Sequence, residues 1–346
     1  MLDKNNIMIL CKVVDNFGDI GVVYRLARAL SDLRAELNLT LVVSNLESFH
    51  KMASQIDPNK DVQEFKYKNS TWKILNWELQ KENFQFSDSD FPFPIILECF
   101  QCGRPDWLEN ILFSQDFTQE VQILNIDYLT AEDYAEEFHL LKSGTRKTNI
   151  RKRFFMPGFT QKTGGLIINE KAHSRNEETE EEFKIFFFAY EDDCSAIVKG
   201  ISDFQSQMRS SKKDFSVCIY LAEGKSSASF EEAWKSSGSP FKIIKLPFMQ
   251  QEEFDTFILT MDFLFIRGED SLARACLSGL PFVWQAYKQD ENYQLVKVNA
   301  LLDQMKDYFP AKEFQAIQNF WKNYNDYENP TQSAQLTELL ISSAMQ

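Results

Sequence analysis

Long apolar runs are lacking in this sequence of 346 residues. No stretch approaches the length of uninterrupted apolar residues that a helix needs to cross a membrane. The residues before position 7 lead directly into a strand-like segment and show no signal-peptide pattern. We therefore expect no membrane attachment and a cytoplasmic location.

Histidine is scarce, and the six cysteines are scattered along the chain. A zinc site needs four ligands grouped at short spacings, and among the cysteines only Cys99 and Cys102 are spaced in this way. The three histidines, His50, His139 and His173, do not complete such a group. We therefore expect reduced, mostly buried thiols and no metal site.

Positive charge is also in deficit, with 37 Lys and Arg against 51 Asp and Glu and a formal net charge of -14. Binding to nucleic acid depends on clustered Lys and Arg that displace counterions from phosphates, so we expect no nucleic-acid partner. A basic partner or a cationic acceptor suits this charge better. The 31 Phe residues predict cores rich in rings, which can also stack on flat ligands.

Strand-like and helix-like segments alternate through most of the chain, which is typical of parallel α/β domains. The first half has predicted strands at residues 7–14, 39–44, 95–99 and 122–126, and predicted helices at about 22–37 and 131–139. The second half has predicted strands at 185–188, 217–221, 243–246, 263–266 and 282–284, and closing helices at 311–323 and 332–345. Residues 57–93 show no clear period.

A charged stretch with few apolar residues, 169–182, predicts a connector between two domains. We expect a first Rossmann-like domain at residues 1–175 and a second at residues 183–330. The last helix, about residues 330–346, is expected to pack back on the first domain.

The loop after the first predicted strand reads Asp-Asn-Phe-Gly-Asp-Ile-Gly over residues 15–21. Gly18 and Gly21 allow a tight turn and a close approach of a ligand to the backbone. Two carboxylates, Asp15 and Asp19, replace the neutral residues of a dinucleotide site, so they suit a cation or a proton to be removed. The alternative is structural, with Asp15 closing an Asx turn and Asp19 capping the helix.

A second loop breaks a predicted strand at Gly268 and leads into a helix. A diphosphate can accept hydrogen bonds from the amides at this helix start and from the Ser271 hydroxyl, with Arg267 adding positive charge. Alternatively, Glu269 and Asp270 only satisfy the helix dipole. Both loops are expected at the carboxyl edges of their sheets, so in a two-domain fold they face one cleft.

These segments carry a resemblance to a known family. The blocks at residues 15–21, 125–132, 155–160 with 163–165, and 267–271 with 281–284 resemble, in order, those of the elongation factor P arginine rhamnosyltransferases. The resemblance implies a GT-B glycosyltransferase fold, with two Rossmann-like domains facing a central cleft. It further implies an inverting transfer of rhamnose from dTDP-β-L-rhamnose to an arginine of elongation factor P, without a metal or cofactor.

Site residues are carried over from the same resemblance. It implies Asp19 as general base, Asp15 as a second essential aspartate and Glu269 as an essential glutamate. The substrate-binding residues that it implies are Asn16, Phe17, Gly18, Tyr190, Phe248, Gln251, Arg267, Gly268, Asp270, Ser271 and Tyr287. Phe248 and Tyr190 are alternatively core aromatics, and Gln251 is alternatively a helix cap.

The sequence departs from the family pattern at three places. Tyr24 stands where the family often has tryptophan, Gln294 where it has histidine, and Phe100-Gln-Cys102 replaces a more usual Phe-Gly-Cys. None of these departures removes a proposed catalytic group, so they affect acceptor detail and local packing more than the reaction.

Arginine is a demanding acceptor, because a guanidinium has a pKa above about 12 and its lone pairs are delocalised. Two carboxylates can accept its N–H groups, orient one nitrogen and take the proton as the new bond forms. Two other readings stay open: a non-catalytic module that binds elongation factor P or another basic partner, and a GT-B transferase with another nucleotide sugar and acceptor.

Overall fold

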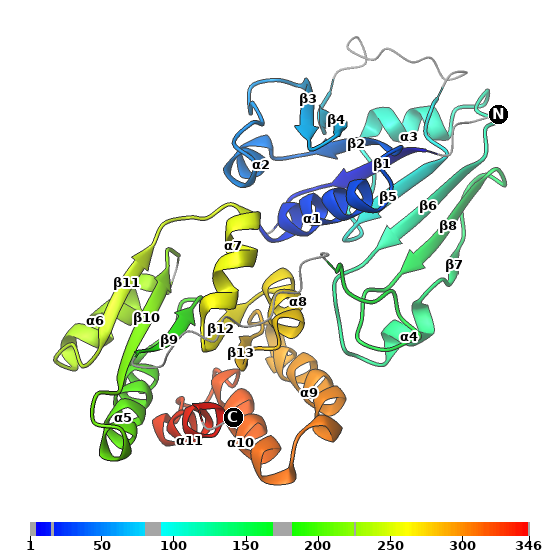
Figure 1. Cartoon of the computed structure of the whole chain (residues 1–346). Coiled ribbons are helices and arrows are strands. Elements are labelled where there is room, and N and C mark those ends of the chain that lie inside the picture. Colours follow the sequence, from blue (N-terminus) through cyan, green and yellow to red (C-terminus); the bar gives the residue numbers. More distant parts are fainter. Residues whose placement is uncertain (1–4, 15–16, 80–90, 169–181, 225, 345–346) are drawn as a thin grey trace. The chain divides into compact units, whose positions relative to one another are not determined.

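The chain folds into two compact units, residues 1–169 and 170–346 (Figure 1). The computed structural model describes residues 5–14, 17–79, 91–168, 182–224 and 226–344. The division between the units falls in the charged stretch that predicts a connector.

The first unit is built on an eight-stranded sheet with the strand order β3-β4-β2-β1-β5-β6-β8-β7. All neighbouring strands from β4 to β8 are parallel, and β3 and β7 add antiparallel edges. In chain order its elements are β1 (Asn6–Cys11), α1 (Gly18–Leu33), β2 (Asn38–Val43), α2 (Leu46–Met52), β3 (Val62–Tyr67), β4 (Ser70–Asn76), β5 (Ile95–Cys99), α3 (Asp106–Leu112), β6 (Val121–Ile126), α4 (Tyr134–Phe138), β7 (Lys142–Ser143) and β8 (Ile150–Phe155).

Alternate residues of β1 face two apolar layers, as the pleat of a strand requires. Ile7 and Ile9 pack in one core cluster with α1 and α2, whereas Met8 and Leu10 pack in the other with α3. Figure 1 shows α1 along one face of this sheet. Helices on both faces explain why β1 is apolar and buried from Ile7 to Cys11.

The second unit has a five-stranded parallel sheet with the order β11-β10-β9-β12-β13. Its strands are β9 (Glu182–Phe187), β10 (Ser216–Ala222), β11 (Lys242–Leu246), β12 (Phe263–Arg267) and β13 (Phe282–Gln285). Its α-helices are α5 (Ser195–Ser211), α6 (Ser227–Ser236), α7 (Gln251–Phe257), α8 (Glu269–Ser278), α9 (Gln294–Met305), α10 (Ala311–Tyr324) and α11 (Ser333–Ala344). Short 3-10 helices occupy Ile258–Thr260, Asp290–Asn292 and Lys306–Tyr308.

Phenylalanines fill both faces of the second sheet. Phe186 meets Phe254 of α7 at 5.6 Å between ring centroids, and its neighbour Phe187 meets Phe230 of α6 at 4.5 Å. Both side chains on β9 are buried. The aromatic richness of the sequence is thus used, at this strand, mainly for packing.

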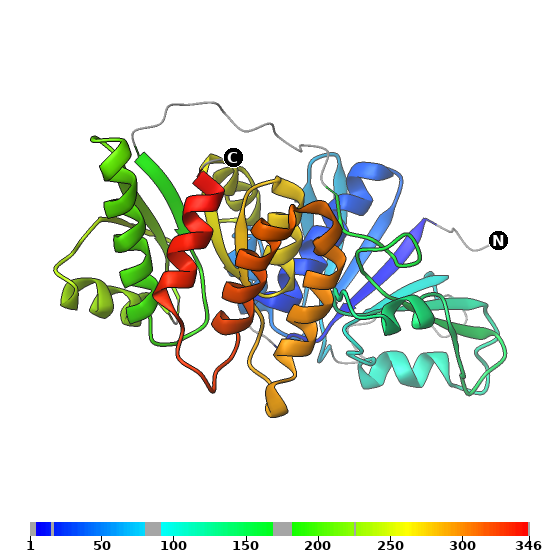
Figure 2. The ribbon, with the colours of Figure 1, turned by 90° about the horizontal axis from the view of Figure 1, so that it is seen from below.

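The last helix, α11, packs against α5 and α10 within the second unit. Figure 2 shows α11, in red, beside α5, in green. The buried face of α11 is therefore covered inside its own unit, and the return of this helix to the first domain stays a prediction.

Several predicted boundaries need correction. The first helix begins at Gly18, not near residue 22, and ends at Leu33, so Leu37 lies outside it. The helix predicted at 131–139 is reduced to Tyr134–Phe138. The stretch without a clear period holds the antiparallel pair β3 and β4, and β8 lies in a segment for which the sequence predicts no strand.

Candidate active site

The strand order of each sheet places its candidate residues at one edge. In the first sheet the chain runs from β1 outward to β2 and β4, then returns to β5 on the other side of β1. In the second sheet it runs from β9 to β10 and β11, then returns to β12. In open parallel sheets, ligands bind beyond the carboxyl ends of the strands at such reversals, which lie here at β1/β5 and β9/β12.

Asp19 lies beyond the carboxyl end of β1, in the first turn of α1, with 1% of its surface exposed. The Val14 amide donates to its Oδ2 at 2.8 Å, and the Tyr128 hydroxyl donates to its Oδ1 at 3.0 Å. The N-cap of α1 is Phe17, and Asp19 accepts from the preceding loop. The capping alternative therefore does not describe Asp19, whose carboxylate is held across the turn.

Of the other candidate residues of this loop, the structure describes two. Phe17 is half-buried, with the Lys51 ammonium 5.5 Å from the centre of its ring, and Gly18 is exposed. Asp15 and Asn16 lie outside the described residues, so the proximity of the two aspartates stays a prediction.

The loops after β5 and β6 contact each other, and the loop after β6 reaches Asp19 through Tyr128; the sequence predicts no role for these side chains. The Phe100 and Tyr128 rings are stacked, with centroids 4.4 Å apart and planes at 17°. Gln101 donates from Nε2 to Asp127 Oδ2 at 2.9 Å. Since β5 and β6 are the next two strands beside β1, their position after the strand ends was the signal that could have identified these residues.

The turn after β5 has a strained backbone. Phe100 and Gln101 have φ values of 60° and 52°, in the left-handed region that favours glycine. The departure from Phe-Gly-Cys therefore puts a glutamine at a position where the backbone suits glycine. Such strain persists where the surroundings fix the chain, which the contacts of both residues do here.

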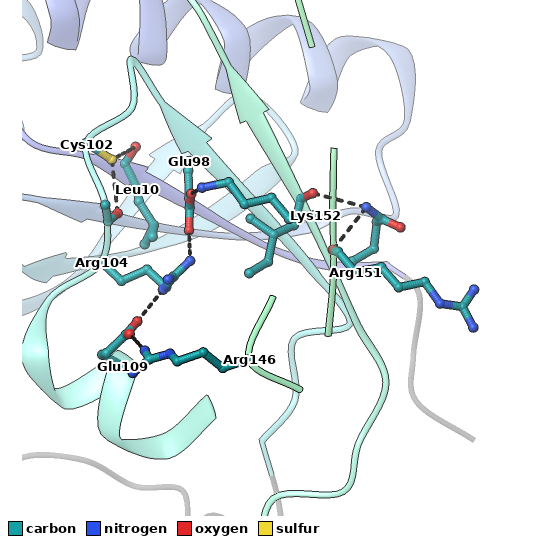
Figure 3. Close-up of polar contacts among 11 residues, drawn as sticks. Leu10, Glu98, Cys102, Arg104, Glu109, Arg146, Arg151 and Lys152 are labelled. Carbon is teal, nitrogen blue, oxygen red and sulfur yellow. Dashed lines mark hydrogen bonds and ion pairs between the residues drawn. The ribbon is translucent and has the colours of Figure 1, made fainter. Parts of the chain in front are cut away.

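A buried ionic network supports the same turn. Glu98 at the end of β5 is fully buried and is paired with Arg104 in the turn and with Lys152 on β8 (Figure 3). Arg104 also contacts Glu109 of α3 at 2.6 Å, and Glu109 is paired with Arg146. Two cations compensate the buried carboxylate, so removal of one would leave a poorly compensated buried charge.

The cysteines near Asp19 stay protonated. Burial raises the pKa of Cys11 and Cys99 well above the ordinary thiol value, with smaller contributions from neighbouring negative charges that include Asp19. Burial also raises the pKa of Cys102 to about 11. Metal ligation and nucleophilic attack both need a thiolate, which these surroundings disfavour. Among the described residues, no group of three or more His, Cys, Asp or Glu is arranged to hold a metal ion.

In the second unit, the candidate residues Tyr190, Arg267 and Tyr287 lie together. The Arg267 guanidinium carbon is 4.7 Å from the centre of the Tyr190 ring and 4.4 Å from that of Phe188. Tyr190 and Tyr287 meet edge to face, with centroids 5.4 Å apart. Since Tyr287 is 63% exposed, a cation and a phenol are presented at an open edge of the sheet.

Gly268 connects Arg267 to α8 with φ 71° and ψ 172°, a conformation that is essentially restricted to glycine. The Trp284 indole donates to the Gly268 carbonyl at 3.2 Å. Glu269, Asp270 and Ser271 form the first turn of α8 and are half-buried. The amides of this turn point out of the helix start, where an anion is favoured, although the two acidic residues also satisfy the helix dipole.

Buried amides fix the loops that carry the tyrosines. Gln285 is fully buried and accepts from the Tyr190 amide at 2.7 Å. Asn325, also fully buried, donates to the Trp284 carbonyl and accepts from the Ala286 amide. Gln294 donates to the Asn325 carbonyl at 3.1 Å, so the glutamine at this family position has a structural role in this chain.

Phe248 and Gln251 lie at the same edge of the sheet, after β11. Phe248 is 49% exposed, so it is not a core aromatic. Gln251 is buried as the first residue of α7, whose cap is Gln250. Since β11 is two strands from β9, the strand ends that precede Phe248 and Tyr190 are roughly 10 Å apart along the sheet. Such a spacing suits a ligand with an aromatic base at one end and charged groups at the other.

None of the described helices is long and apolar enough to cross a membrane.

Comparison with known proteins gives a consistent family assignment. Residues 7–344 match the family described as Elongation-Factor P (EF-P) rhamnosyltransferase EarP. The chain is 28% identical to a protein-arginine rhamnosyltransferase of Shewanella oneidensis, over 93% of this chain and 90% of that protein. It is 26% identical to a protein-arginine rhamnosyltransferase of Pseudomonas aeruginosa, over 92% and 86% of the two chains.

A solved structure shares the fold. It is described as "Structural basis for EarP-mediated arginine glycosylation of translation elongation factor EF-P" and superimposes with a TM-score of 0.50 at 20% identity. The match covers 99% of this chain and 94% of that chain, so the likeness extends over both units.

Proposed function

This chain belongs to the elongation factor P rhamnosyltransferase family and is a glycosyltransferase, and we propose that it transfers rhamnose from dTDP-β-L-rhamnose to an arginine of translation elongation factor P. The related solved structure concerns glycosylation of that factor, which supports it as the acceptor. Because this acceptor is a translation factor, we place the reaction in the cytoplasm.

Asp19 is the observation that carries the proposal. A guanidinium is a poor nucleophile until it is oriented and loses a proton. Asp19 is fixed by two donors beyond the carboxyl end of β1, where a sheet of this kind binds its ligands. In this scheme its carboxylate orients one guanidinium nitrogen and accepts that nitrogen's proton. Asp15 is proposed as a second orienting carboxylate.

The bond changes follow an inverting displacement. The guanidinium nitrogen forms a bond to the anomeric carbon of rhamnose while the bond from that carbon to the β-phosphate oxygen breaks. The electron pair leaves with dTDP, and the nitrogen's proton goes to Asp19. Because attack and departure occur on opposite faces of the sugar carbon, its configuration inverts.

The groups of the second unit suit the donor. Arg267, Tyr287 and the first amides of α8 can stabilise the charge that develops on the β-phosphate. We assign the nucleotide to Tyr190, Phe248 and Gln251, with Asp270 and Ser271 contacting the donor at the helix start. Glu269 is assigned to sugar or ribose hydroxyls. We propose that these groups work without a metal ion or other cofactor.

Intact-mass spectrometry of elongation factor P tests the function directly. Incubation with this protein and dTDP-rhamnose is expected to add one deoxyhexose, which fragmentation places on an arginine. Addition of EDTA is expected to leave the rate unchanged, and a loss of activity that a divalent ion restores would contradict the metal-free reaction.

Ligand competition separates the remaining readings. dTDP is expected to bind and to inhibit more strongly than UDP, and the reverse order would indicate a different nucleotide sugar. Binding of elongation factor P without any binding of dTDP would indicate a non-catalytic module.

A further inference from the structure

A tyrosine beside Asp19 has a defined geometry and no part in the scheme above. Tyr128 follows β6, and its hydroxyl donates to Asp19 Oδ1 at 3.0 Å. Its side chain reaches the carboxylate from the other side of β5, across one intervening strand. The contact therefore joins two loops that are distant in the sequence.

The Tyr128 ring is itself held in place. It stacks on Phe100, whose amide donates to the Ile126 carbonyl at 2.6 Å. The Tyr128 amide donates to Asp127 Oδ1 at 2.8 Å, and Gln101 donates to the other oxygen of Asp127. Backbone and ring are thus both fixed, which reduces the freedom of the hydroxyl that reaches Asp19.

We propose that Tyr128 is a positioning residue for the transfer: its hydroxyl, held by the stack on Phe100, fixes the carboxylate of Asp19 in the orientation that accepts the guanidinium proton. The inference rests on the proposed function, because it assumes that Asp19 acts as the base. A base must lie within hydrogen-bond reach of the proton that it removes, so a rotation of the carboxylate lowers the rate.

The strands packed beside Asp19 carry thiols that stay neutral. The thiols of Cys11 on β1 and Cys99 on β5 are among the groups that face the carboxylate, and their raised pKa values keep them neutral at working pH. Tyr128 approaches from the loop after β6, and Val14 from the loop after β1.

Tyr128→Phe tests the inference, because it keeps the ring and removes only the hydroxyl. We expect kcat to fall roughly tenfold or more, the range for a lost hydrogen bond to a charged group. The KM values for donor and acceptor are expected to stay within about twofold. Thermal stability, measured for the same variant, shows whether a loss of folding contributes to the change in kcat.

The chain offers a matched control in the same unit. The Tyr67 hydroxyl donates to Asp32 Oδ2, also at 3.0 Å, but this carboxylate has no proposed role in the reaction. Tyr67→Phe therefore removes a hydrogen bond of the same length to a more exposed carboxylate and is expected to leave kcat unchanged. An equal loss in the Tyr67 and Tyr128 variants would contradict a specific role for Tyr128.

A second variant keeps the test decisive if Tyr128→Phe is poorly folded. Phe100→Leu removes the stacking partner but leaves the hydroxyl, so a smaller loss of kcat at unchanged KM values is expected. An unchanged kcat in the folded Tyr128→Phe variant would overturn the proposal. So would an increase in the KM of elongation factor P at unchanged kcat, which would make Tyr128 an acceptor contact. Lack of transfer by the wild-type protein would instead contradict the proposed function.

Discussion

Both units place their candidate residues beyond the carboxyl ends of parallel strands, but the side chains there differ in kind. In the first, the buried carboxylate of Asp19 is held by a backbone amide and a tyrosine hydroxyl. In the second, Arg267 lies against aromatic rings at an edge where Tyr287 is largely exposed. One edge suits proton removal from a fixed position, and the other suits a large anionic ligand. The position of a site thus follows from the sheet, whereas its chemistry follows from the loops.

The backbone of the two edges differs in the same way. In the second unit the turn before α8 uses a glycine, Gly268, in a conformation that only glycine adopts readily. In the first unit the turn after β5 holds Phe100 and Gln101 at positive φ. There the strained backbone is stabilised by side-chain contacts, including the stack of Phe100 on Tyr128 and the hydrogen bond from Gln101 to Asp127.

Loss of the proposed base should have the largest effect. Asp19→Asn is expected to lower transfer about 10²- to 10⁴-fold, the contribution typical of a general base, because an amide accepts no proton. dTDP affinity, measured by calorimetry, should stay within about twofold if proton removal and donor binding are separate functions. Near-wild-type turnover would exclude Asp19 as the base.

Asp32→Asn is the matched control for this change. Asp32 also accepts a hydrogen bond from a tyrosine in the first unit, from Tyr67. Its replacement should leave turnover unchanged, and the thermal stability of both variants shows whether either effect comes from folding.

The next largest effect is expected from loss of the Arg267 side chain in the second unit. Arg267→Ala is expected to weaken dTDP binding about 10- to 100-fold, as for loss of a charge-assisted hydrogen bond, and to slow the reaction. Arg267→Lys should recover only part of the dTDP affinity, because an ammonium lacks the planar face that lies against Phe188 and Tyr190. Unchanged dTDP affinity in the calorimeter would remove Arg267 from the diphosphate site. Lys288→Ala removes the cation that follows Tyr287 in the sequence and serves as the control, which is expected to leave dTDP affinity unchanged.

Gly268→Ala should lower both the stability of the protein and its affinity for dTDP, by less than the preceding change. A side chain at φ 71° and ψ 172° is expected to cost about 1–3 kcal/mol of stability and to displace the start of α8, which lowers dTDP affinity. Gly238→Ala is the control, because Gly238 also has positive φ, 77°, and an added Cβ meets nothing within 4 Å. The control should lose stability in denaturant titrations without a change in dTDP affinity. Equal losses of affinity would show that α8 does not contact the donor.

Much of this organisation follows from the sequence, because parallel strands buried on both faces are nearly continuous apolar runs. The strand predicted at 95–99 coincides with β5, and the predicted strands of the second unit deviate from the observed ones by at most a few residues. The predicted GT-B class, with two Rossmann-like units, is confirmed by the two sheets and by the related solved structure. The central cleft and the roles of the candidate residues stay predictions.

What the sequence could not give are contacts that depend on strand order. Asp19 and Tyr128 are 109 positions apart, and their hydrogen bond requires that β5 lie between β1 and β6. The start of α1 was also predicted too late, because Gly18 and Asp19 are weak helix formers that the loop contact to Val14 holds in place. β3 and β4 were missed because β3 is an edge strand with mostly exposed polar residues, and β4 alternates buried and exposed residues, so neither has a continuous apolar signal.

The smallest expected effect isolates the strain at Gln101. Gln101→Ala and Gln101→Gly both remove the hydrogen bond to Asp127, but only glycine relieves the backbone at φ 52°. In denaturant titrations, Gln101→Gly should therefore be about 1 kcal/mol more stable than Gln101→Ala. If the alanine variant is as stable or more so, the turn is not held in the left-handed conformation. A result in favour of glycine would show that the first unit tolerates strain beside Asp19 which the second unit avoids with Gly268.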